Sequence, residues 1–156
     1  MNQKPALDLW GPLPIPGASR TPADVLREQA EVLGTKTKNV LIGSLDSQIA
    51  FSSEKICIRF VVRAPALEYR TSLFEIEHAA SSPYPCVVRS TLATVNTSGK
   101  SYRKAKYPTA DSEPDLVEMV KNILQSPEVQ RIIAGLLETS RVTEEPKQKG
   151  GAFAAF

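Results

Sequence analysis

The sequence is poor in the residues that carry most catalytic and metal chemistry. It has one histidine and two cysteines among its 156 residues, and it holds neither a Cys-x-x-Cys pair nor a glycine-rich phosphate-binding loop. These absences exclude a zinc ribbon, a thioredoxin-type motif and the common nucleotide-binding loops. No Gly-x-Ser-x-Gly nucleophile motif is present either. The sequence therefore predicts a protein that is not an enzyme and uses no metal and no cofactor.

Long hydrophobic runs are also lacking. No window approaches the roughly 20 apolar residues of a membrane span. Pro12, Pro14 and Pro16 interrupt the segment where a signal peptide would need an apolar stretch. The two thiols, Cys57 and Cys86, lie inside apolar runs, as expected for small buried side chains in a reducing compartment. We therefore expect a soluble, cytoplasmic protein that does not contact a membrane.

An excess of charge of one sign is the third absence. The chain carries 19 basic and 17 acidic residues, a net charge of +2. Domains that bind duplex nucleic acid usually concentrate a stronger positive excess on one face, so global charge says little about partners. A hydrophobic fraction of 42% in a chain of this length predicts one domain with a real core.

Hydrophobic periodicity predicts an α+β fold. Apolar residues recur at helical spacing after the N-cap candidate Thr21 up to the stop candidate Gly34, then in alternation, then at helical spacing again. The expected elements are a helix over 22–33, strands over 40–51, 56–63, 69–78 and 86–95, and two helices between residues 113 and 141. Short connections favour an antiparallel meander sheet of about four strands with the helices packed on it. A curled sheet wrapped around the last helix is the alternative.

Strand alternation also assigns the faces of this sheet. It places Leu73 on the solvent face together with Glu75 and Glu77. Arg59 and Arg63 of the preceding strand are predicted to lie across from these two glutamates.

The single domain over 21–142 has apolar extensions on both sides. The proline-rich leader, residues 1–20, contains the only tryptophan, Trp10, and either lies over the domain as a plug or serves as a docking peptide. The first interpretation is favoured. The tail, residues 143–156, reads as a flexible linker with an apolar end that includes Phe153 and Phe156. It docks on a partner, folds back on the domain or stays disordered.

Two weaker readings concern catalysis and metal binding. Glu75, Glu77 and His78 resemble a ligand cluster, but alternation puts His78 on the opposite face of the strand. A cysteine–histidine enzyme would need Cys57 or Cys86 exposed near His78. A charged solvent face and buried thiols are the favoured interpretations.

The segment 98–107 is basic, aromatic and free of acids. Cations that meet phosphates and rings that stack on unpaired bases suit nucleic acid, and Arg59, Arg63 and Arg89 would extend the surface. Another anionic partner is a further option, and a solvated face is the favoured interpretation. The candidate contacts are Lys100, Tyr102, Arg103, Lys104, Lys106 and Tyr107.

The sequence thus favours a non-catalytic protein-interaction module: an adaptor, an inhibitor or a small subunit of a complex. Its partner would be another protein, contacted through Trp10, Phe153 and Phe156. A nucleic-acid-binding module that uses segment 98–107 is the alternative. A homo-oligomer formed through a sheet edge is a further option.

Overall fold

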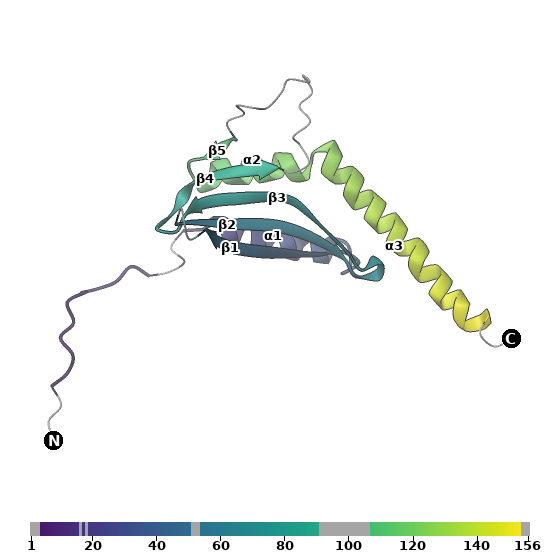
Figure 1. Cartoon of the computed structure of the whole chain (residues 1–156), viewed down its shortest axis with the longest axis horizontal. Coiled ribbons are helices and arrows are strands. Elements are labelled where there is room, and N and C mark those ends of the chain that lie inside the picture. Colours follow the sequence, from purple (N-terminus) through teal and green to yellow (C-terminus); the bar gives the residue numbers. More distant parts are fainter. Residues whose placement is uncertain (1–3, 16, 18, 51–53, 91–106, 154–156) are drawn as a thin grey trace.

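The computed structural model describes residues 4–15, 17, 19–50, 54–90 and 107–153. One helix, an antiparallel meander sheet and two further helices follow one another along the chain (Figure 1). This order confirms the predicted α+β class, with a short fifth strand added. The elements are α1 (Pro22–Lys36), β1 (Ile42–Ala50), β2 (Lys55–Ala64), the 3-10 turn η1 (Pro65–Leu67), β3 (Tyr69–Ala79), β4 (Ser82–Ser90), β5 (Thr109–Ala110), α2 (Glu113–Leu124) and α3 (Pro127–Phe153).

Helix α1 begins as its local chemistry dictates. The Thr21 hydroxyl accepts a hydrogen bond from the Asp24 amide, and the Asp24 carboxylate accepts one from the Thr21 amide. That backbone hydrogen bond is the main reason why the pKa of Asp24 lies below its usual value. The predicted end at Gly34 is wrong, because the helix continues to Lys36 and stops where Lys38 turns left-handed at a φ of 52°.

Helix α1 approaches β1 very closely at Gly43. A Cβ atom at this position would lie 2.7 Å from Ala30 Cα and 2.8 Å from Ala30 Cβ. Such distances are shorter than real carbon contacts, so glycine is required for the helix to sit on the strand.

We expect Gly43→Ala to lower the free energy of unfolding by about 1–3 kcal/mol, since it forces α1 away from the sheet. Urea denaturation measures the change. Gly135 in α3 has no atom within 4 Å of such a Cβ, so Gly135→Ala is the matched control and should raise stability by roughly 0.5–1 kcal/mol. Equal effects of the two substitutions would contradict the close packing at Gly43.

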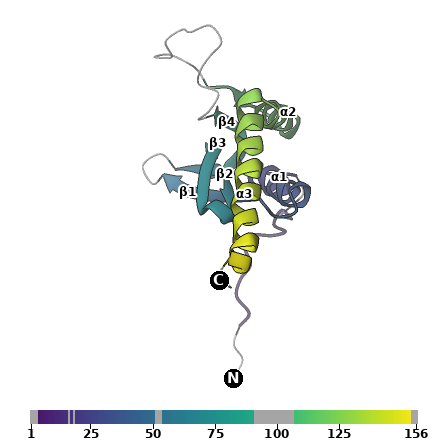
Figure 2. The same ribbon diagram turned by 90° about the vertical axis from the view of Figure 1, so that its right-hand side faces the viewer.

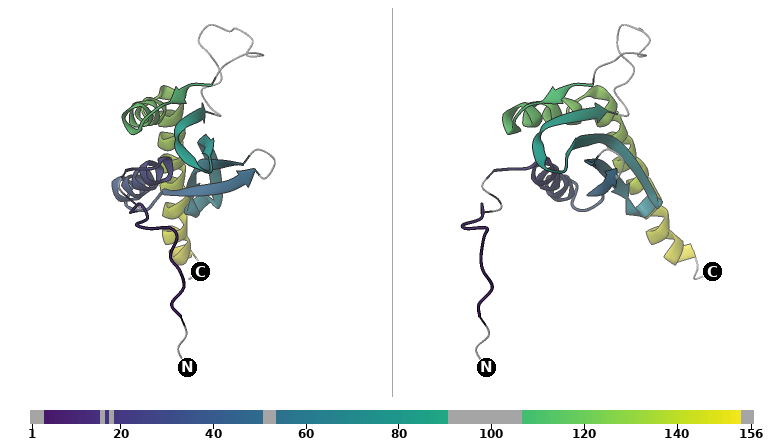
Figure 3. Two further views of the ribbon diagram at one scale, coloured as in Figure 1. Left: turned by 90° about the vertical axis from the view of Figure 1, so that its left-hand side faces the viewer. Right: turned by 60° about the vertical axis from the view of Figure 1, so that its left-hand side comes forward.

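The core lies between the sheet and the helices, which occupy the same face (Figure 3). Phe60 and Phe74 stack at its centre with ring centroids 5.4 Å apart. Beside them the pairing register shifts, so that Phe60 stands opposite Phe74 and Val61 opposite Ser72. Leu73 is the extra residue of this β-bulge and is 1% exposed. The predicted solvent position of Leu73 is therefore wrong.

The opposite face of the sheet is charged and its charges are balanced. Arg63 stands opposite Arg70 rather than a glutamate, so its predicted pairing is wrong, whereas the Arg59–Glu75 pairing is confirmed. N···O distances of 3.0–3.6 Å join the neighbouring strands through the ion pairs Arg59–Glu75, Arg89–Glu75, Arg89–Glu77 and Lys55–Glu77. With side chains partly open to water, these pairs contribute modestly to stability and mainly keep the face polar.

Two predicted irregular segments are regular in the structure. Strand β4 starts at Ser82, within the predicted 79–85 loop. The backbone of α3 remains helical through most of the predicted linker, up to Phe153. Val129, near the start of the helix, packs against the core. The later part contains Pro146, Gly150 and Gly151, which are poor helix formers, so local propensity does not explain why the helix continues. Its C-terminal part projects past the sheet (Figures 1 and 2), and it packs on η1 and α2, so the sheet does not wrap around it.

Candidate functional site

The described part of the leader exposes most of its apolar surface. Trp10 is 81% exposed, and the other large apolar side chains of the leader are between 64% and 82% exposed. The segment runs away from the domain (Figure 1). The interpretation that Trp10 plugs the edge of the core is therefore wrong for this structure.

The root of the leader, in contrast, is fixed to the domain. The Tyr84 hydroxyl donates a hydrogen bond of 2.9 Å to the Arg20 carbonyl. The Arg20 guanidinium forms ion pairs with Glu28 of α1 at 2.6 Å and with Glu113 of α2 at 3.8 Å. Burial is the main cause that raises the pKa of Tyr84 to about 12, so its hydroxyl remains a donor at neutral pH. The leader thus departs from a defined point between α1 and α2.

An apolar groove of about 630 Å³ lies between α1, α2 and α3. The side chains of Phe60, Val62 and Leu73 line it from the sheet, and exposed Val32 and Val117 line it from α1 and α2. Polar side chains share its lining: Arg20, Glu28, Gln29, Lys36, Lys121, Gln125 and Gln130. Val32 is seven residues after buried Val25, and Val117 is three residues before buried Val120, so both valines continue the apolar stripes of their helices. The sequence alone therefore does not mark them as groove residues.

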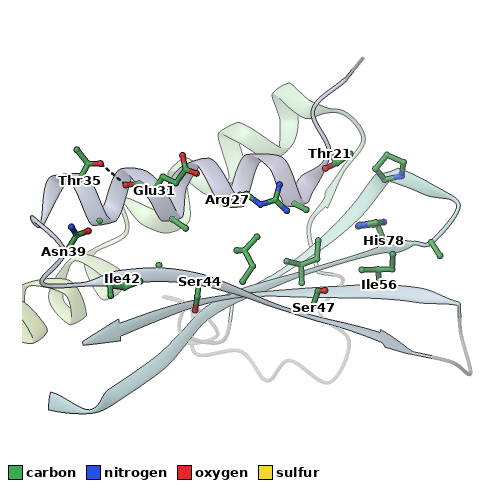
Figure 4. A pocket seen from close by; sticks show the side chains of 18 of the residues that line it. Thr21, Arg27, Glu31, Thr35, Asn39, Ile42, Ser44, Ser47, Ile56 and His78 are labelled. Carbon is green, nitrogen blue, oxygen red and sulfur yellow. Dashed lines mark hydrogen bonds between the residues drawn. The ribbon is translucent and has the colours of Figure 1, made fainter. Parts of the chain in front are cut away.

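A second groove, of about 970 Å³, lies on the other side of α1 (Figure 4). Arg27 and Glu31 line it from the helix, and Ser47, Ile56 and His78 line it from the sheet. The helix and the strands enclose it only in part, because α1 diverges from the far end of the β1–β2 hairpin (Figure 4).

The histidine and one cysteine are neighbours but do not form an activated pair. His78 stands opposite Cys86 in the β3–β4 register, and its Nδ1 lies 2.8 Å from the Ala79 carbonyl oxygen. Burial raises the pKa of Cys86 to about 11, so the thiol is protonated at neutral pH. Burial is also the main cause of the raised pKa of Cys57. Within the described ranges, no cluster of three or more histidine, cysteine, aspartate or glutamate side chains is arranged to hold a metal.

Most of the predicted nucleic-acid contacts lie outside the described residues. Only Tyr107 of that set is described. It is half-exposed, and Arg89 Cζ lies 5.1 Å from the centroid of its ring. The acids of the sheet face neutralise Arg59 and Arg89, so these two side chains do not extend a free basic surface. The contacts outside the described residues are Lys100, Tyr102, Arg103, Lys104 and Lys106.

The tail residues are placed only in part. Phe153 is the last residue of α3, and Phe156 lies outside the described residues. The predicted contact through these two side chains therefore stays a prediction.

The fold defines the class of this protein: an α+β domain with a five-stranded antiparallel sheet and helices on one face. Comparison with protein-family models, with curated proteins and with solved structures finds no match. In the described part of the chain, no helix is both long and apolar enough to cross a bilayer.

Proposed function

We propose that this protein is a non-catalytic protein-interaction module, an adaptor, inhibitor or small subunit, that presents its leader to another protein. The observation that carries the proposal is the exposure of Leu7, Leu9, Trp10, Leu13 and Ile15 on a segment whose root is anchored. Single exposed apolar residues are normal on protein surfaces, but a contiguous set usually marks an interaction site.

The composition of the leader suits peptide recognition. Pro5, Pro12 and Pro14 restrict the backbone to extended conformations, so less conformational entropy is lost when the segment binds. Trp10 supplies a large rigid anchor of the kind that dominates binding energy at interfaces. Asp8 is the only charged residue from residue 5 to residue 15. The expected partner therefore offers an apolar, aromatic-lined groove, and the affinity should depend little on salt.

The test is capture of a partner by the tagged full-length protein from its native lysate, with and without nuclease. We expect one stoichiometric, nuclease-resistant protein, and we expect Trp10→Ala with Leu13→Ala to reduce its capture at least tenfold. A synthetic peptide of residues 4–17 should compete with the full-length protein for the partner. The melting temperature should not change, because both side chains lie outside the core.

Tyr69→Ala is the matched control, since Tyr69 is an exposed aromatic side chain on the domain. It should leave capture intact. A partner that is retained equally by the leader variant and the control would contradict the proposal. Material that is lost on nuclease treatment would instead favour the nucleic-acid module.

A further inference from the structure

Strand β1 is a long edge without the usual protection. It is nine residues long, and in the part of the chain that the structure describes nothing pairs with its outer edge. Natural edge strands are usually blunted by lysine, proline, a bulge or short length. β1 has no lysine and no proline, and its register with β2 is unbroken. Its only charged residue, Asp46, is already paired with Arg70.

The opposite edge of the sheet differs. β5 is two residues long and directly follows Pro108. That edge offers a short ladder, whereas β1 spans about 30 Å of backbone at the usual rise per residue. The sheet is therefore open to strand addition at β1.

Helix α1 leaves one corner of the sheet uncovered beside this edge. Its start is held near β4 by the bond between Tyr84 and the Arg20 carbonyl, and its second half meets β1 at Gly43. The helix thus runs diagonally, and the far ends of β1 and β2 extend beyond its cover. Ile49 at that corner is 58% exposed, and Ile56 faces the open end of the groove beside α1 (Figure 4).

We propose that a second copy of this chain adds its β1 antiparallel to β1, so that the two sheets become continuous. A two-fold axis makes such an interface self-complementary, with each residue contact occurring twice. Antiparallel pairing brings the start of the second copy's β1, and the end of the helix above it, to the uncovered corner at Ile49.

The charges on α1 fit this symmetry. Arg27 and Glu31 lie one turn apart and both line the groove beside α1. Glu31 has no ion pair among the described residues, and Arg27 has an exposed pair with Asp24 at 3.3 Å. An axis between Arg27 and Glu31 places each of them against the opposite charge of the second copy.

One two-fold axis can serve both the strand pairing and the charge pairs of the helices. Ala30 lies directly on Gly43, so an axis that passes α1 at the level of Gln29 also passes β1 near Ser44. With the axis at Ser44, the first five residues of β1 (Ile42–Asp46) pair with the same five of the second copy. Asp46 then faces Ile42 of the second copy, so the two Asp46 carboxylates are not opposed.

Sedimentation equilibrium of the full-length protein over a hundredfold concentration range tests the proposal. We expect the average mass to rise from 17.0 kDa toward twice that value. Ser47→Lys with Ile49→Lys should raise the dimer Kd at least tenfold, because lysines on an edge strand oppose the addition of a further strand. Val117→Lys with Val142→Lys, on exposed helix positions, is the matched control and should leave Kd unchanged.

A charge exchange tests the placement of the helices. Arg27→Glu and Glu31→Arg should each weaken the dimer, and the double variant should restore it. A protein that stays monomeric at every concentration overturns the proposal, as does a dimer unaffected by the edge lysines or a double variant as weak as the singles. A dimer lost on deletion of residues 1–17 overturns it as well, since the leaders would then hold the copies together. The dimer is independent of the proposed function and survives if leader capture fails.

Discussion

Phe74→Ala is expected to lower the free energy of unfolding by about 3–5 kcal/mol. Phe74 is fully buried and stacks on Phe60 with the ring planes 7° apart. Removing one ring leaves a cavity between the sheet and the helices, and it removes the aromatic contact. Urea denaturation followed by circular dichroism measures the loss.

A loss of this size approaches the whole stability of an ordinary domain, so Phe74→Leu provides a milder variant. It should cost about 1–2 kcal/mol because most of the volume is kept. Tyr69→Ala on the same strand is the control and should stay within about 0.5 kcal/mol of the wild type, since Tyr69 is exposed. A change at Phe74 no larger than at Tyr69 would show that the aromatic stack is not at the centre of the core.

Leu73→Asp is expected to lower the free energy of unfolding by more than about 3 kcal/mol, because it buries a carboxylate in apolar surroundings. Leu73→Ala should cost about 2–5 kcal/mol for the cavity alone. Denaturation midpoints in urea give both values. If Leu73 lay on the solvent face with Glu75, either substitution would change stability by less than about 0.5 kcal/mol.

Tyr69→Asp, which places the same carboxylate at an exposed site of the same strand, is the matched control. A Leu73→Asp variant as stable as this control would contradict the β-bulge. The experiment therefore separates the strict alternation that the sequence suggests from the shifted register in the structure.

Elements fixed by local chemistry could be predicted from the sequence. The start of α1 depends on Thr21, Pro22 and Asp24, which are neighbours in the chain. The end of α1 could not be predicted as well. Gly34 tolerates a helical conformation, and the helix continues to Lys36, just before left-handed Lys38. There the Thr37 hydroxyl donates to the Leu33 carbonyl and accepts from the Leu41 amide.

Features that depend on distant parts of the chain were also missed. The β-bulge at Leu73 depends on how β3 pairs with β2. The alternation of residues within β3 alone gives no information on a shift in the pairing of the two strands. Gly43 did carry a signal, because glycine inside a strand often marks a close backbone approach.

The same distinction between local and long-range features applies to the candidate site. The sequence singled out Trp10, but whether it lies on the domain or in solvent depends on the shape of the folded surface. The two grooves depend on the spacing and direction of α1 relative to its neighbours. Residue patterns along one helix do not set that spacing. Val32 and Val117 continue the apolar stripes of their helices, so their exposure at the groove could not be predicted from the sequence either.

The anchored root of the leader limits how far its tryptophan can travel. Trp10 is ten residues from Arg20, so it stays within about 36 Å of Arg20 even when the intervening chain is fully extended at about 3.6 Å per residue. A protein captured by the leader is therefore tethered near the domain at a millimolar effective concentration. The same protein could then make a second, weak contact with the groove between α1, α2 and α3. That contact would be intramolecular within the complex and would slow its dissociation.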